Sequence, residues 1–302
     1  MYANIENVVK VDDDTVNIIL KRIFPSIVGY LAHPKAAVYT QEDIEALGTN
    51  TVETPVGTGP YQYVDFVHGD RITLKANPDY WDGAPSIENL EFKVIVDESV
   101  RTVSLETGDI QGVMEVAPSQ VEILKDNTNI TITPFESMIV DYVGINATSP
   151  KLQNKKLREA IFMAIDKQAI IDSVYFGYAK PVEALFDDRM FGALTENDTL
   201  TYNPEAARKI IEEEGLKGTK LTILANEGVR VKSAEVIQHF LKEVGIDAEI
   251  RVLEWATYLD TLMQGNHELF LLGWSNSAFD PDSSLYTIYH TDNIKTGSVL
   301  LS

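Results

Sequence analysis

Side chains that could perform chemistry are few and scattered in this sequence. There is no cysteine, which excludes disulfides, thiolate nucleophiles and cysteine-bound metals. The five histidines show no i,i+4 pair and no HExxH motif, and GxSxG is absent. We therefore expect no catalytic residues, no metal and no cofactor. An α/β hydrolytic enzyme is the alternative from another functional class.

Other polar groupings also suggest structure rather than chemistry. Asp280 and Asp282 flank a proline, but the segment lacks the further spaced oxygen ligands of a calcium loop. The segment at 57–59, GTG, has neither the lysine nor the following helix of a phosphate loop, so a turn is expected. Trp255 and Trp274 could bury in a core or supply flat apolar walls to a ligand, and composition alone favours the core.

The length and charge of the chain limit its function classes. Its 302 residues exceed one average domain, so two or more lobes are expected. The formal charge of -21 argues against nucleic acid and anionic lipid as partners. This charge favours solubility, or less strongly the attraction of a cationic ligand. No run reaches the roughly 18 apolar residues of a membrane span.

The spacing of apolar residues, together with Gly, Pro, Asn and Asp at the ends of segments, predicts the helices and strands that position the polar and aromatic residues named above. A hairpin is expected at 61–76 around the turn at 68–70, and a helix capped by Asp97 and stopped by Gly108. The first half is further predicted to contain strands at 16–20 (buried), 90–96, 110–113 and 139–145, and helices at 41–47, 118–125 and 155–176, the last capped by Asn154.

The last third alternates regularly between strands and helices. Strands are expected at 221–224, 248–253 and 269–274, separated by helices at 233–244 and 256–264, after a helix that begins at Asn203-Pro204. A β-α-β-α-β order predicts a mostly parallel sheet with right-handed crossovers. Ligands of such sheets lie beyond the carboxyl ends of the strands. Two of these ends are at Asn226 and at 273–276.

Five short segments occur in a fixed order along the chain. They are VGTGPY (56–61), NPDYWDGAP (77–85), LREAIFMAID (157–166), LEWATYL (253–259) and GWSNSAFDPD (273–282). In this order and spacing they resemble the family 5 solute-binding proteins of peptide-type ABC importers. The resemblance covers nearly the whole chain.

The resemblance implies an α/β fold like that of periplasmic binding proteins, of class II and cluster C type, with two large lobes of mixed sheets flanked by helices. It implies that residues 1–48 end the small lobe, that 49–150 form part of the first large lobe, and that 151–302 form the second. It also implies that the chain is incomplete, with family residues preceding Met1 and a segment that returns to the first lobe following Ser302.

The resemblance also implies a ligand site between the large lobes. The backbone of the GWSNSAFDP segment would pair with an extended peptide. Ser277 stands where peptide binders carry an aspartate for the ligand's α-ammonium, and Ala225-Asn226 stand where dipeptide binders carry an arginine, with Arg230 a few residues on. These departures favour a longer peptide or a neutral ligand over a dipeptide. The expected ligand contacts are His33, Glu115, Asn226, Trp255, Trp274, Ser275, Asn276, Ser277 and Phe279.

The function implied is that of an extracytoplasmic solute-binding protein of a bacterial ABC importer. It would capture an oligopeptide and deliver it to the transmembrane subunits of the permease, as a monomer, lipid-anchored in the full-length parent. An oligosaccharide is the alternative ligand. A nickel chelate ranks third as a ligand, because this chain has His33 near the place where nickel-binding members carry the arginine that they use for the chelate.

Overall fold

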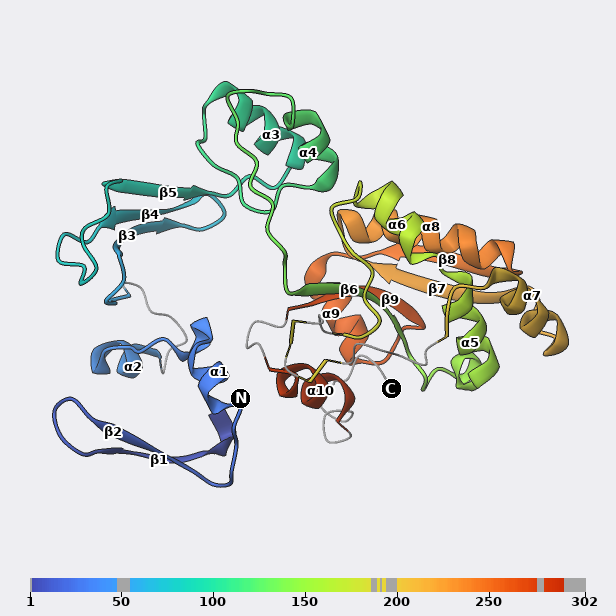
Figure 1. The fold of residues 1–302 in the computed structure, drawn as a ribbon, viewed down its shortest axis with the longest axis horizontal. Helices are drawn as coiled ribbons and strands as arrows, with labels where there is room; N and C mark the ends of the chain where they lie inside the picture. The colour runs from blue at the N-terminus through green and yellow to red at the C-terminus, as the bar shows by residue number, and fades with distance from the viewer. Residues whose placement is uncertain are drawn as a thin grey trace. The chain divides into compact units, whose positions relative to one another are not determined.

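The computed structural model describes residues 2–47, 55–185, 189–190, 192–193, 200–275 and 280–290 (Figure 1). The chain divides into two compact units, residues 1–32 together with 117–302, and residues 33–116. The predicted lobe boundaries differ from these units and stay a prediction about the longer family fold. No helix in the described ranges has the length and apolar character needed to cross a bilayer.

The unit of residues 33–116 is built on a three-stranded antiparallel sheet of order β3-β4-β5. The expected hairpin of β3 (Tyr61–Val67) and β4 (Arg71–Ala76) is confirmed, and β5 (Asn89–Lys93) adds to β4. Asp97 accepts from the Val100 amide at the start of α3 (Glu98–Thr107), and Gly108 ends that helix with φ 82°, both as predicted. The unit also contains η2 (Pro34–Ala36) and α2 (Gln41–Leu47).

The larger unit contains a four-stranded sheet of order β6-β9-β7-β8. Strands β7 (Thr219–Ala225), β8 (Ile246–Val252) and β9 (Leu269–Ser275) run parallel, as the alternating order predicts. Strand β6 (Ile139–Ile145) pairs antiparallel with β9 along its whole length, from Ile139 opposite Ser275 to Ile145 opposite Leu269. The amino end of β6 therefore lies at the same edge as the carboxyl ends of the parallel strands.

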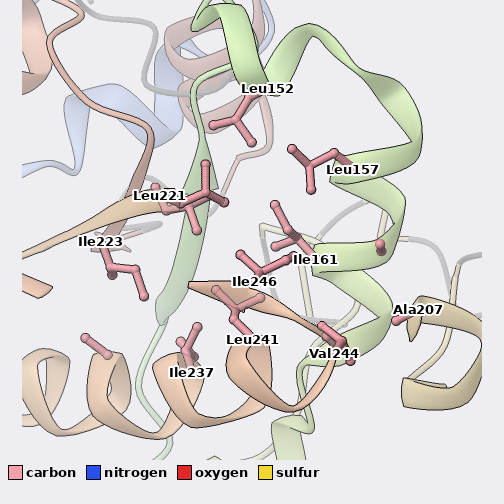
Figure 2. Close-up of a cluster of buried hydrophobic side chains, with 14 of the residues drawn as sticks. Leu152, Leu157, Ile161, Ala207, Leu221, Ile223, Ile237, Leu241, Val244 and Ile246 are labelled. Carbon is pink, nitrogen blue, oxygen red and sulfur yellow. The ribbon is translucent and has the colours of Figure 1, made fainter. Parts of the chain in front are cut away.

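One face of this sheet buries the main hydrophobic core. Side chains of α5 (Lys155–Ala164), α7 (Pro204–Glu213) and α8 (Val229–Glu243) pack on β7, β8 and β9. Figure 2 shows Ile237 and Leu241 of α8 pointing toward the strands, with Ile161 of α5 beside Ile246. Helical spacing of i and i+4 places these residues on one stripe, which fixes α8 across the strands.

The opposite face carries a smaller core around α9 (Trp255–Met263). Tyr258 and Leu262 of this helix pack with Leu224, Phe270 and Leu272. Alternation along β9 explains the division, because successive residues of a strand point to opposite faces. Leu269, Leu271 and Gly273 belong to the first face, while Phe270, Leu272 and Trp274 belong to the second.

The larger unit contains several further elements. They are η1 (Tyr2–Asn4), β1 (Ile5–Lys10), β2 (Val16–Leu20), α1 (Ile27–Leu31), α4 (Pro118–Leu124), η3 (Pro150–Gln153), α6 (Lys167–Val174) and α10 (Asp282–Tyr289).

Four predictions about helices and strands are wrong in burial, presence, continuity or starting residue. The strand at 16–20 forms but is exposed, because β1 and β2 make only a two-stranded sheet. The predicted strand at 110–113 is absent from this described stretch, since the Ile110 amide donates back to the Ser104 carbonyl (3.2 Å) in the helix ending.

The helix predicted over 155–176 is two helices. Ile165 and Asp166 adopt extended backbone, and the Asp166 side chain accepts from the Ala169 amide at the start of α6. An aspartate side chain stabilises a helix more at the N-cap, where it accepts from a free backbone amide, than in the helix interior. Helix α8 begins at Val229 rather than at 233, after Gly228 with φ 57°. Arg230 therefore lies in the first turn of α8, not in a loop.

Candidate ligand-binding edge of the four-stranded sheet

The sheet brings together four of the predicted contact residues at its carboxyl edge. Asn226 follows β7 directly, Trp255 begins α9 just after β8, and Trp274 and Ser275 end β9. Asn276, Ser277 and Phe279 lie outside the described residues. His33 and Glu115 belong to the other unit, where His33 is half-buried and Glu115 is exposed with a left-handed backbone (φ 56°).

The two tryptophans differ in their surroundings. Trp274 is half-buried, and its Nε1 donates to the Oγ of the fully buried Ser284 on α10 (3.0 Å). Trp255 is 45% exposed, and its ring stacks on that of Tyr258 with centroids 5.9 Å apart and planes at 12°. Trp255 therefore offers a supported aromatic face to solvent, whereas Trp274 is held in place by α10.

Asn226 is the buried polar residue of this edge. It is only 7% exposed, and its Oδ1 has no hydrogen-bond partner among the described residues. A buried oxygen acceptor without a donor costs about 1–3 kcal/mol. A ligand N–H would remove this cost.

Strand β9 extends past its neighbour β7 at the same edge. The register between them covers Ile223 with Leu269 and Leu224 with Phe270, whereas β6 accompanies β9 as far as Ser275. Within the described residues, Gly273–Ser275 therefore has a strand partner on the β6 side only. We call this stretch the β9 end. A strand end without a second ladder partner can in principle pair with a further extended segment by main-chain hydrogen bonds.

An ion pair that sequence reasoning did not find lies over the β9 end. Asp141 of β6 accepts at Oδ1 from Arg230 Nε (3.1 Å) and Nη2 (3.0 Å), and at Oδ2 from the Tyr175 hydroxyl (2.9 Å). The side chains of Arg230 and Asp141 are 25% and 32% exposed. Burial and the Asp141 carboxylate raise the pKa of Tyr175, so this hydroxyl stays a donor.

Gly273 makes room for this pair. Asp141 and Gly273 are direct partners in the β6–β9 register. A Cβ on Gly273 would lie 2.5 Å from Arg230 Nη2 and 2.8 Å from Asp141 Oδ1. The guanidinium therefore rests against the main chain of the β9 end. In the sequence, this cluster is indicated by Asp141, the single charged residue in the otherwise apolar strand IVDYVGI.

The far side of the sheet contributes buried phenols rather than charges. The Tyr258 hydroxyl donates to the Leu271 carbonyl (2.5 Å), while the Tyr142 hydroxyl has no hydrogen-bond partner in the described part. Burial raises the pKa of both hydroxyls, which remain protonated. No cluster of three or more potential metal-ligating side chains occurs among the described residues.

Comparison with known proteins places this arrangement in a family. Residues 1–296 match the bacterial extracellular solute-binding proteins, family 5 Middle. The chain belongs to this family. It is 31% identical to the dipeptide-binding protein of Escherichia coli K12 over 97% of its own length and 57% of that protein.

Solved structures agree with this assignment. The dipeptide-binding protein from Pseudoalteromonas sp. SM9913, in complex with Met-Leu, matches 98% of the chain and 61% of that structure with a TM-score of 0.87 and 25% identity. The periplasmic binding protein DppA of Helicobacter pylori, in complex with the peptide STSA, matches 97% and 59% with a TM-score of 0.85 and 26% identity. The fold class predicted from sequence is confirmed. The chain spans about three fifths of each relative.

Proposed function

We propose that this chain is part of an extracytoplasmic solute-binding protein that captures peptides and delivers them to the transmembrane subunits of an ABC importer. The observation that carries the proposal is family membership over residues 1–296, together with relatives whose names state dipeptide or peptide binding. The protein acts by binding and release, without chemical turnover.

The β9 end supports a peptide over other solutes. An extended peptide adds to Gly273–Ser275 by main-chain hydrogen bonds, which are insensitive to the side chains of the peptide. Asn226 supplies an acceptor that lacks a donor in the described structure. Trp255 supplies an exposed aromatic face for an apolar side chain of the peptide. An oligosaccharide has no main-chain amides with which to form such a ladder.

The proposal is tested by native mass spectrometry and calorimetric titration. The chain is expressed with any coding sequence that adjoins it in its gene, and the native mass is compared with the denatured mass. Retained adducts of peptide mass, and saturable binding of tri- and tetrapeptides, are expected. Binding of maltotetraose with no peptide binding would contradict the peptide assignment. Hydrolysis of the peptides at a catalytic rate would contradict the assignment as a binding protein.

A further inference from the structure

The indole of Trp274 is joined to α10 through its only polar atom. Its Nε1 donates to the Oγ of Ser284 at 3.0 Å. Ser284 is fully buried, whereas Trp274 at the end of β9 is half-buried. An indole carries a single N–H, which can donate but not accept. Because this donor is bound inside the protein, the ring offers only carbon surface to a ligand.

Helix α10 is fixed by contacts that do not involve Trp274. At its start, Asp282 accepts at Oδ2 from the hydroxyl of Tyr30 on α1 (3.0 Å), and Tyr30 is only 5% exposed. Near its end, Ile288 is fully buried. Ser284 lies between these two attachments, one helical turn before Ile288. The Oγ of Ser284 is therefore a fixed point that orients the indole.

The oriented ring lies at the sheet edge to which we assign peptide binding. Trp274 belongs to the β9 end, and strand alternation places its side chain on the same face as α9. A tryptophan side chain that turns freely about its two torsions has to be ordered when a ligand packs on it, which weakens binding. The hydrogen bond to Ser284 selects one orientation before the ligand arrives, and so lowers this cost.

We propose that Ser284 is a positioning residue that holds Trp274 as an apolar wall for side chains of the bound peptide. The wall favours large apolar side chains, because their burial on an aromatic face is favourable and the engaged N–H offers polar side chains no donor. Ser284 is itself fully buried, so it acts through Trp274 and not by contacting the peptide. This inference rests on the proposed peptide-binding function.

Two peptides of equal length report on the wall. They are tri-leucine and tri-alanine, each titrated calorimetrically into the chain expressed with any coding sequence that adjoins it in its gene. The two share their main-chain and terminal groups and differ only in their side chains. The wild-type protein should bind tri-leucine about tenfold or more tightly than tri-alanine, as expected for the burial of one isobutyl group.

Variants of α10 test the role of the hydroxyl. Ser284→Ala should reduce the preference for tri-leucine about three- to tenfold, the range for one lost hydrogen bond, and change the affinity for tri-alanine less than about twofold. Ser284→Cys keeps the side-chain size with a weakly accepting sulfur, so it should show a similar loss even if the alanine variant folds poorly. The matched control is Ser283→Ala, because the neighbouring Ser283 donates to the Asp280 carbonyl (2.9 Å) and should leave the preference intact.

A double-mutant cycle assigns the effect to Trp274. Trp274→Phe keeps an aromatic ring without the N–H, so Ser284→Ala should change the preference less than about twofold in that background. A general disturbance of α10 would lower the preference by the same factor in both backgrounds. In protein labelled with 5-fluorotryptophan, the ¹⁹F resonance that Trp274→Phe removes belongs to Trp274. Ser284→Ala should shift or broaden this resonance and leave that of Trp81 in place.

The outcomes separate two failures. The role of Ser284 is refuted, while peptide binding stands, if Ser284→Ala keeps the full preference for tri-leucine or loses it equally in the wild-type and Trp274→Phe backgrounds. An unchanged Trp274 resonance, or a wild-type protein that binds both peptides equally, likewise refutes it. If the wild-type protein binds neither peptide, the proposed function itself fails. A ratio of two affinities is insensitive to a partial loss of folded protein, so it does not report a merely structural role.

Discussion

Replacing Gly144 with alanine tests the packing that joins β6 to the parallel strands. Gly144 lies directly opposite Phe270 in the β6–β9 ladder. A Cβ at this position would fall inside contact distance of ring atoms Cζ and Cε1 of Phe270. Phe270 is fully buried, with its ring edge-on to Tyr142 (centroids 6.0 Å apart). The ring cannot yield without displacing its neighbours.

The expected cost follows from two bounds. Adding a methyl group to a well-packed core costs about 1–3 kcal/mol. Losing the contacts of a buried phenylalanine costs about 3–5 kcal/mol. Because the methyl group and the ring would occupy the same place, Gly144→Ala should lower the free energy of unfolding by about 3 kcal/mol. At 2–4 °C per kcal/mol for a unit of this size, Tm should fall by about 6–12 °C.

The assay is urea unfolding followed by tryptophan fluorescence, since Trp255 and Trp274 both flank this core. Phe270→Leu provides space, so Gly144→Ala should cost less in that background. A double-mutant cycle over the two sites should give a coupling of at least about 1 kcal/mol. Leucine is chosen because it keeps the site apolar while shortening the ring's reach.

The control is Gly112→Ala, because a Cβ on Gly112 meets no atom within 4 Å. It should change stability by no more than about 0.5 kcal/mol. A cost below about 1 kcal/mol for Gly144→Ala would refute the steric conflict with Phe270. Costs at positions 144 and 270 that are additive within about 0.5 kcal/mol would refute it too, since neighbours that compete for one volume cannot be independent.

Three further predictions concern other parts of the larger unit. Gly273→Ala should cost about 1–3 kcal/mol by pushing Arg230 off Asp141, measured by urea unfolding. Burial holds the pKa of His267 below its usual value of about 6.5. The contribution of neutral His267 to the free energy of unfolding should therefore be complete above that pH and fall as the pH drops below it. His267→Gln should flatten the dependence of the urea midpoint on pH between pH 7 and 5. Asn154→Ala should cost about 1 kcal/mol in thermal unfolding, because its side chain accepts from two amides at the start of α5.

Each of these has a control variant or an outcome that would refute it. Gly112→Ala serves again for Gly273, and a null effect at 273 would contradict the close approach. If the urea midpoint of His267→Gln depends on pH as that of the wild-type protein does, burial of His267 does not govern this titration. Asn154→Ser keeps a capping oxygen and should recover most of the loss, and equal losses for serine and alanine would argue against a cap.

Sequence reasoning succeeded where the deciding interactions are local. The hairpin of β3 and β4 and the start and end of α3 follow from residues within a few positions of one another. It failed where two local preferences compete, such as continuing a helix and capping a new one. Asp166 caps a second helix instead of continuing the first, and the turn at Gly228 starts α8 early enough to include Arg230. All of the ligand contacts predicted from the sequence, from His33 to Phe279, stay predictions.

The alternation of strands and helices in the last third and the family resemblance follow from the order of residues alone, because apolar periodicity, caps and ordered motifs are local features of the chain. The contact of Asp141 with Arg230 follows from the folded structure. These residues are 89 positions apart, and their meeting requires β6 to join β9 antiparallel with Asp141 opposite Gly273. That register depends on which side chains fit together across the sheet, as Phe270 does over Gly144. No short-range pattern encodes such a fit.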